Sequence, residues 1–336
     1  MLRIGIVSAA HIAPAALVIP AALNPEVEIT AIAARDRTRA QEFASAHGIE
    51  NVLDTYDDLC SSDLVDAVYI ATPAALHREW TVKALAAGKH VLCEKPIGAN
   101  ADDARAMVDA GRKSGLVMME AFHWRYHPMA EMIRRIVDEE LGRLTHIEAS
   151  FTIGHIPDDD IRFELALGGG ALMDLGVYPL QWVRFVAGDP AEPTVWSAHA
   201  AHVRGLIDVE IEANLLFRDN CSARIHCSMV SGVPFAASLR VEGERGTLHV
   251  TNPLAPQMGN DLHVVTAAGE RHETAPGTST YSHQLAAFVG AVQRGIPVPT
   301  GGADSVAMMS TVDAIYTAAG LGPRPSWPAE IIQNYD

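Results

Sequence analysis

The sequence has little positive charge and few cysteines. Its 336 residues include 25 Lys and Arg against 41 Asp and Glu, which gives a formal net charge of -16. Nucleic acids and anionic membrane surfaces bind basic faces, so this balance argues against both as partners. The four cysteines do not have the CxxC spacing of a metal site; they are Cys60, Cys93, Cys221 and Cys227. We therefore expect reduced thiols, no metal site and a cytoplasmic protein.

Long hydrophobic runs are also missing. The longest early run, residues 12–23, is broken by Pro14 and Pro20 and is too short to span a membrane. Residues 1–13 have the basic residue and apolar stretch of a signal peptide, but they fit better as a first strand that the fold needs. A length of 336 residues, 49% of them hydrophobic, suits a globular protein of two domains.

Strands and helices alternate over about the first 120 residues. This order predicts a doubly wound parallel sheet, the Rossmann type of α/β fold, with a dinucleotide-binding domain at residues 1–122. Apolar strands are predicted at residues 2–7, 27–33, 66–71, 90–93 and 116–121.

The pattern changes after Pro128 and predicts an α+β domain at residues 123–336. Residues 209–217 alternate: Val209, Ile211, Ala213, Leu215 and Phe217 share one face, and Asp208, Glu210, Glu212 and Asn214 share the other. Such a strand belongs to an open, mostly antiparallel sheet with one covered face. An open face often joins copies of a chain, so we expect a homodimer or homotetramer, provided that the glutamates find partners. Further strands are predicted at 144–154, 195–203, 222–229, 238–242, 247–250 and 262–266, with helices at 129–140, 282–294 and 303–319.

The turn after the first strand is where a dinucleotide-binding protein carries G-x-G-x-x-G. Glycines there let backbone N–H groups approach a pyrophosphate at a helix N-terminus. Here the three positions hold Ser8, Ala10 and Ala13, which are small but include no glycine. Taken alone, the segment fits a plain strand-to-helix turn equally well.

Arginines follow the second predicted strand. At this position a carboxylate would bind the ribose of NAD, whereas arginine accommodates the 2′-phosphate of NADP. Ala34 provides no carboxylate, and Arg35 and Arg39 lie one helical turn apart. These residues favour NADP, with NAD possible; the alternative interpretation is a solvated charged loop.

Two further segments carry titratable side chains. In HVLCEKP, Lys95 follows an apolar strand and would lie where open α/β sheets bind ligands; alternatively, it is a surface lysine paired with Glu94. In GGGALMDLGVYP, Asp174 and Tyr178 are four residues apart and would share one helix face. If Lys95 and Tyr178 meet across a cleft, they form an acid/base pair for an alcohol. Pro179 weakens this interpretation, and a tyrosine buried against the sheet remains the alternative.

Together these segments resemble the glucose-fructose oxidoreductase / inositol dehydrogenase (Gfo/Idh/MocA) family. The resemblance rests on AGKHVLCEKP followed by GGGALMDLGVYP, with ARDRTRAQEFA, YIATPAALHREW and MEAFHWRYHP in the expected order. Within the family, the chain is most similar to the NADP-dependent dihydrodiol dehydrogenase and sugar dehydrogenase branch.

The resemblance implies an NADP(H)-dependent oxidoreductase acting on a carbinol carbon of a sugar, polyol or related diol. Lys95 would lie beside the nicotinamide, Tyr178 would move the hydroxyl proton, and Asp174 would orient the substrate or this pair. The resemblance places the remaining cofactor contacts at Ser8, Ala10, His11 and Ile12 in the turn, at Thr72, His77 and Glu94 in the groove, at Trp124 and Arg125 beside the nicotinamide, and at Arg35 and Arg39 on the 2′-phosphate.

The chain also departs from the family pattern. No glycine remains in the phosphate turn, and Ala74 replaces a common asparagine. Two alternatives therefore stay open: an NAD-retaining glycosidase or lyase of the same fold, and a non-catalytic cofactor-binding homologue.

Overall fold

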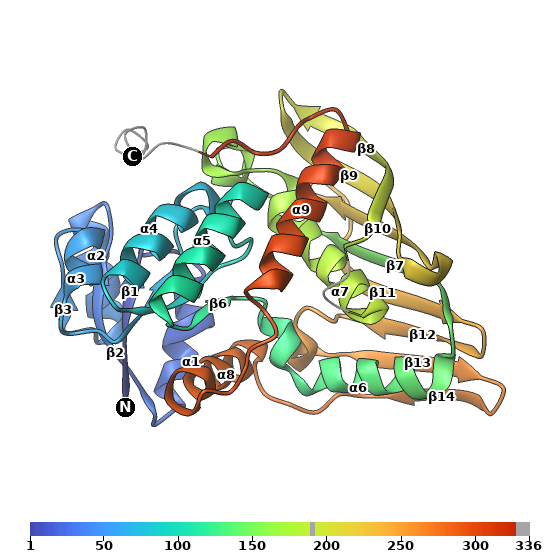
Figure 1. The fold of residues 1–336 in the computed structure, drawn as a ribbon, viewed down its shortest axis with the longest axis horizontal. Helices are drawn as coiled ribbons and strands as arrows, with labels where there is room; N and C mark the ends of the chain where they lie inside the picture. The colour runs from blue at the N-terminus through green and yellow to red at the C-terminus, as the bar shows by residue number, and fades with distance from the viewer. Residues whose placement is uncertain (189–191, 327–336) are drawn as a thin grey trace. The chain divides into compact units, whose positions relative to one another are not determined.

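The computed structural model describes residues 1–188 and 192–326, which form two compact units (Figure 1). The first unit contains Met1–His123, Tyr281–Val306 and Ser326, and the second contains Trp124–Thr280 and Ala307–Pro325. The first boundary therefore falls one residue after the predicted one. The prediction of a continuous second domain at residues 123–336 is wrong, because a later segment belongs to the first unit.

The first unit contains a sheet with the strand order β3-β2-β1-β4-β5-β6, in which every pairing is parallel. This is the predicted Rossmann arrangement, with helices between successive strands. Its strands are β1 Leu2–Val7, β2 Val27–Ala33, β3 Asn51–Val52, β4 Ala67–Ile70, β5 His90–Cys93 and β6 Met118–Glu120. Its helices are α1 Ile19–Ala22, α2 Arg37–His47, α3 Tyr56–Ser61, α4 Ala74–Ala86 and α5 Ala101–Ser114, with α8 Thr280–Arg294 from the later segment.

The helix after β1 is interrupted at its prolines. A π-helical turn, Pro14–Val18, precedes α1, and Pro20 lies in the first turn of α1. Proline is tolerated in a first turn because its missing N–H would have had no partner in the helix. Pro20 lies directly after the point at which π-helical geometry changes to α-helical geometry.

Residues 281–306 are held to the first unit by hydrogen bonds at the edge strand β6. The backbone N–H of Glu120 donates to the carbonyl of Thr300 at 3.1 Å, and the Thr300 hydroxyl donates to the Glu120 carbonyl at 2.6 Å. Arg294 adds an ion pair with Glu26 at 2.7 Å. Hydrophobic periodicity predicts that this segment is helical, but it does not say which sheet the helix packs against.

The second unit contains a sheet with the order β14-β13-β12-β11-β7-β10-β9-β8. Only the pairing of β7 with β10 is parallel among those described, so the prediction of a mostly antiparallel sheet is confirmed. Its strands are β7 Leu144–Thr152, β8 Thr194–Arg204, β9 Ile207–Leu216, β10 Ser222–Ser228, β11 Ala236–Gly243, β12 Gly246–Thr251, β13 Asp261–Thr266 and β14 Gly269–Glu273. Its helices are α6 Pro128–Ile136, α7 Val177–Ala187 and most of α9 Ala303–Ala318.

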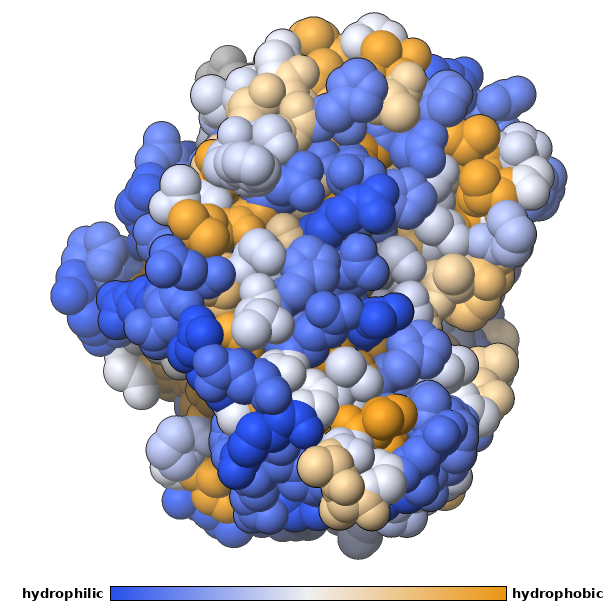
Figure 2. All heavy atoms as spheres, turned by 90° about the vertical axis from the view of Figure 1, so that its right-hand side faces the viewer, coloured by the Kyte–Doolittle hydropathy of each residue, from blue (hydrophilic) through white to orange (hydrophobic). Residues whose placement is uncertain are grey.

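Helix α7 covers one face of this sheet, and the other face is open. Side chains of β7 that point towards α7 are buried, including Ile147 and Phe151. The glutamates of β9 on the open face do have partners: Glu210 contacts His202 at 2.6 Å and His226 at 2.9 Å. The side of the molecule in Figure 2 is mostly hydrophilic, with apolar residues in small separate patches.

The position of Asp208 differs from the one predicted for it at the start of β9. It was expected on the open face with Glu210, but its side chain is fully buried. The reason is a set of buried polar partners at the start of β9, described below. In the described part of the chain, no helix combines the length and hydropathy needed to cross a bilayer.

Candidate active site

The turn after β1 has a positive φ at the position where the motif would have its first glycine. Ser8 has φ +89°, in the left-handed region that favours glycine, and its N–H donates to the carbonyl of Ala33 at 2.9 Å. Ala10 is half-buried and Ala13 is buried, whereas His11 and Ile12 are exposed. A serine thus holds the backbone where the first glycine of the motif would stand.

Tyr56 connects this turn to the arginines after β2, which the sequence analysis did not foresee. Its side chain is buried near Ser8 and Arg35, and burial raises the pKa of its hydroxyl. A guanidinium N–H of Arg39 reaches the carbonyl of Ala9 at 3.4 Å. Arg35 and Arg39 are exposed, and their contact with a 2′-phosphate remains a prediction.

His77 joins the loops that follow β4 and β5. It is 1% exposed, with Nε2 2.7 Å from the carbonyl of Thr72 and Nδ1 2.8 Å from the carbonyl of Pro96. Burial lowers its pKa, although the two carbonyls oppose this shift. Because both ring nitrogens are engaged, His77 supports the predicted groove and does not line it.

A buried carboxylate holds the segment after Lys95 from the other side. Glu120 is fully buried, and its Oε1 accepts the backbone N–H of Ile97 at 2.9 Å. Its Oε2 accepts the hydroxyl of Ser305 at 2.5 Å. The loop that carries Lys95 is therefore fixed by side chains from α4, β6 and α9.

Lys95 is half-buried among aromatic and acidic groups of the first unit. Glu94 next to it accepts the Tyr69 hydroxyl at 2.7 Å. Burial, and to a smaller extent the positive charge of Lys95, lowers the pKa of His123 to about 3. His123, whose ring lies 4.2 Å from that of Tyr281, is therefore neutral at ordinary pH. Lys95 is a cationic side chain close enough to act on His123.

The segment that follows the three glycines of the second unit is helical, which is the condition under which Asp174 and Tyr178 share one face. A π-helical turn, Leu172–Gly176, leads directly into α7, and Pro179 lies in the first turn of that helix. The proline therefore does not break the helix between Asp174 and Tyr178. Such π-helical insertions occur frequently at functional sites.

Asp174 and Tyr178 are both held by neighbours in the second unit. An oxygen of Asp174 accepts from Nε of Arg162 at 2.5 Å, and Arg162 is also paired with Asp160 at 2.9 Å. Tyr178 is 6% exposed, and its ring packs edge-on against Phe151 with centroids 5.8 Å apart. Arg162 is a further site residue that the sequence analysis missed, because it lies in the irregular segment before the glycines.

A buried ion pair explains the last of the three consecutive glycines. A Cβ on Gly170, which has φ +133°, would lie 2.2 Å from Oδ1 of Asp208 and 2.7 Å from the Tyr316 hydroxyl. Arg324 pairs with Asp208 and donates to the carbonyl of Gly169 at 2.9 Å. The other Asp208 oxygen accepts the N–H of Leu172 at 2.7 Å. The glycines therefore permit close approach to another part of the fold.

The surroundings of Trp124 differ from those predicted, which were beside the nicotinamide. It is 1% exposed, its indole N–H bonds Oε1 of Gln181, and its ring packs edge-on against Phe185. It belongs to the core of the second unit and does not border a cofactor, because an apolar ring of this size is stabilised by burial. The Arg125 guanidinium lies 4.0 Å from the centre of the Phe185 ring, and its cofactor contact remains a prediction.

The first unit fits a dinucleotide. Thr72 has a buried hydroxyl that finds no hydrogen-bond partner within the described residues, at the carboxyl end of β4. Ligands of open α/β sheets bind at these strand ends, and the arginines and the Ser8 turn lie at the ends of β2 and β1. The fold and these side chains define a dinucleotide-binding protein of the Rossmann class.

Comparisons with known proteins are consistent with this class. A model described as "Oxidoreductase family, NAD-binding Rossmann fold" matches residues 2–122, and one described as "GFO/IDH/MocA C-terminal domain" matches residues 129–249. The chain belongs to the GFO/IDH/MocA oxidoreductase family.

Relatives share most of the chain. D-xylose 1-dehydrogenase (NADP(+)) 2 of Haloferax volcanii is 34% identical over 310 residues, covering 91% of this chain and 94% of that protein. Trans-1,2-dihydrobenzene-1,2-diol dehydrogenase of Sus scrofa is 35% identical over 256 residues, 75% of each chain. A 3-ketoreductase from Actinomadura kijaniata, solved with NADP and TDP-benzene, has a TM-score of 0.87 at 31% identity, covering 94% and 97%.

The left-handed conformation of Ser8 makes a prediction about stability. A non-glycine residue held there costs of order 1–3 kcal/mol, so Ser8→Gly should keep or raise the thermal midpoint, whereas Ser8→Val should lower it. Ser45, in the last turn of α2, is the matched control, since glycine has a lower helix propensity than serine and Ser45→Gly should lose about 0.5 kcal/mol. Thermal unfolding of the three variants measures this, and an equal fall in Ser8→Gly and Ser45→Gly would contradict strain at Ser8.

Proposed function

We propose that this protein is an NADP(H)-dependent oxidoreductase that acts on a carbinol carbon of a sugar, polyol or related diol. The observation that carries the proposal is the exposed arginine pair, Arg35 and Arg39, beside a phosphate turn whose Ser8 has a positive φ. The names of the relatives, an NADP(+) xylose dehydrogenase, a dihydrodiol dehydrogenase and a ketoreductase solved with NADP, support the same class.

The first unit would hold the dinucleotide. Backbone N–H groups of the Ser8 turn would bind the pyrophosphate, and the two arginines would bind the 2′-phosphate. Thr72 offers its unpaired hydroxyl at the adjacent strand end. When bound, the nicotinamide supplies or accepts the hydride, and the protein must manage the proton of the alcohol.

Tyr178 and Lys95 are the residues proposed to manage that proton. The Tyr178 hydroxyl would donate it to a carbonyl substrate or accept it from an alcohol, and the Lys95 ammonium would favour the phenolate form. Asp174, held by Arg162, would orient the substrate hydroxyls. His123 has a lowered pKa that suits a neutral, supporting role.

Arg35 and Arg39 predict that the protein binds NADPH in preference to NADH. Replacing Arg35 and Arg39 by Ala should weaken NADPH binding by about 10- to 100-fold, since charge-assisted hydrogen bonds contribute roughly 1.5–3 kcal/mol, and should leave NADH binding nearly unchanged. Arg37 is the matched control, because it lies between them and is paired with Asp54. Fluorescence titration with both nucleotides tests this; equal losses for NADPH and NADH would argue against a 2′-phosphate site.

If the Tyr178 hydroxyl transfers the proton, its removal should slow the catalysed reaction. Tyr178→Phe should lower kcat about 100- to 10,000-fold on the best substrate from a panel of aldoses, polyols and diols, with NADPH affinity unchanged. In Lys95→Met, the pH dependence of kcat should move to higher pH, because the positive charge that favours the phenolate is gone.

Tyr316→Phe is the control for a merely structural tyrosine. It removes a hydroxyl that donates to Asp208 at 2.9 Å, so it should lower stability by about 1–2 kcal/mol and leave kcat near the wild-type value. Turnover by Tyr178→Phe that equals the wild type, measured where both variants are folded, would refute the assignment of Tyr178.

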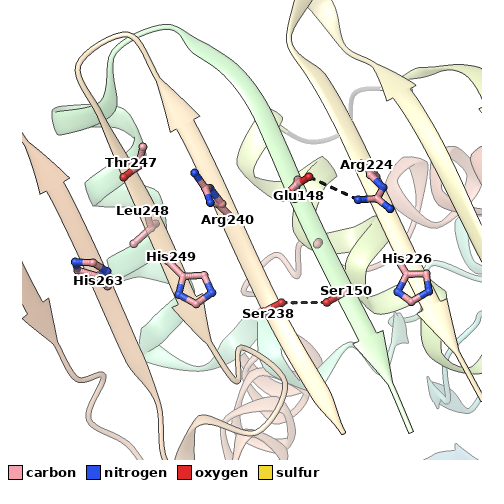
Figure 3. A pocket seen from close by; sticks show the side chains of 11 residues that line it. Glu148, Ser150, Arg224, His226, Ser238, Arg240, Thr247, Leu248, His249 and His263 are labelled. Carbon is pink, nitrogen blue, oxygen red and sulfur yellow. Dashed lines mark hydrogen bonds and ion pairs between the residues drawn. The ribbon is translucent and has the colours of Figure 1, made fainter. Parts of the chain in front are cut away.

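We further infer that copies of the chain associate through the open sheet face. Ser150 and Ser238 lie at its centre with their hydroxyls 3.0 Å apart, and the surrounding charges are already paired, as between Glu148 and Arg224 (Figure 3). Covering such a face leaves few charges unpaired.

If copies of the chain associate, the mass in solution should exceed the 36.0 kDa of one chain. Ser238→Arg should lower the mass found by light scattering, because it inserts a bulky charge at the proposed contact, whereas Ser45→Arg on α2 should not. A wild-type mass of one chain would exclude the interface.

A further inference from the structure

The hairpin of β13 and β14, at the edge of the second sheet, brings two histidines and a glutamate together. His263 and His272 are directly opposite each other, with rings 4.4 Å apart and within 3° of parallel. Glu270 lies two residues before His272 on the same strand face, and its Oε1 is 2.8 Å from Nε2 of His263 and 4.0 Å from Nε2 of His272. One ligand atom from each residue lies within 4.8 Å of the other two.

These separations suit a small divalent ion. Zn²⁺ binds imidazole nitrogen and carboxylate oxygen at about 2.0–2.2 Å in a tetrahedral shell, which places neighbouring ligand atoms roughly 3.4 Å apart. The distances from Glu270 to the two histidines, 2.8 and 4.0 Å, lie on either side of that value. The two imidazole rings, which stack in this structure, would have to rotate about their side-chain bonds so that both Nε2 lone pairs point at one ion; the backbone of the hairpin need not move.

A second carboxylate orients one of the histidines. Both oxygens of Asp261 lie 3.0 Å from Nδ1 of His272, so this nitrogen carries the proton and leaves the lone pair on Nε2, towards Glu270. Histidines that bind metals almost always donate their other N–H in this way, which fixes the ring and raises its basicity.

The hairpin backbone is also fixed. Leu262 and Val264 of β13 are buried on the covered side, and Arg271 of β14 bonds Oε1 of Glu140 at 2.7 Å. The alternation along each strand then directs His263, Glu270 and His272 to the open side. Ligands on a rigid two-stranded element do not need ordering at the moment of binding.

We propose that His263, Glu270 and His272 form a binding site for one divalent transition-metal ion of the zinc type, with water as the fourth ligand. The His263 and His272 ligand atoms are Nε2, and Asp261 supports the site through His272. The site lies on the opposite side of the sheet from Tyr178, so it is separate from the proposed chemistry of the alcohol.

A comparable surface cluster shows what distinguishes this arrangement. His202 and His226 also contact one glutamate, Glu210, but they bind its two different oxygens, Oε2 and Oε1. Among the described residues, only the hairpin cluster brings three such ligand atoms within 4.8 Å of one another. His202 is a matched control, since its side chain is 61% exposed and that of His272 is 60% exposed.

Calorimetric titration of the tag-free, metal-stripped chain with Zn²⁺ tests the site. The wild type should bind one ion, and His272→Ala or Glu270→Gln should abolish this event. Asp261→Asn should weaken it by about 10- to 100-fold, as loss of an outer-shell partner does. His202→Ala should bind as the wild type does, and Co²⁺ in place of Zn²⁺ should give a tetrahedral absorption spectrum that His272→Ala lacks.

Adventitious binding would give a different pattern. Losses in His202→Ala equal to those in His272→Ala, or retention of the ion by His263→Ala and Glu270→Gln, would overturn the proposal. The side chains replaced are 30–63% exposed, so the variants should fold, and far-ultraviolet circular dichroism checks this.

Discussion

In each unit, a buried carboxylate with a partner for each oxygen holds the segment that carries the side chains proposed for catalysis. In the first unit, Glu120 accepts from Ile97 and Ser305 and so holds the loop that carries Lys95. In the second, Asp208 accepts from Leu172 and Tyr316 and pairs with Arg324. A carboxylate taken out of water is costly unless it is paired and hydrogen-bonded, so each of these residues requires one arrangement of the backbone around it.

The turn after β1 departs from the glycine motif in sequence but has a positive φ at the position of its first glycine. The glycine pattern matters because it permits a backbone conformation and close approach, and Ser8 adopts that conformation despite its side chain. Tyr56 is buried close to Ser8 and Arg35. The missing glycines therefore do not favour a non-catalytic homologue over an oxidoreductase.

Some residues predicted to contact the cofactor instead have structural roles. His77 joins two loop carbonyls, and Trp124 lies in the core of the second unit. A motif in a sequence combines residues that contact a ligand with residues that hold those contacts in place, and the spacing is the same for both. Burial separates them, since a side chain that is 1% exposed with its polar atoms engaged has no surface left for a cofactor.

The sequence by itself determined the α/β order of the first unit, the open antiparallel sheet and the family, because these depend on local periodicity and on contiguous motifs. It also indicated Arg35 and Arg39 from their place after β2. Only the tertiary structure decided that residues 281–306 join the first unit, that Asp208 is buried with Arg324, and that His263 faces His272. Each of these depends on contacts between residues far apart in the chain, or on a strand register that a two-residue turn sets, and neither is encoded by periodicity.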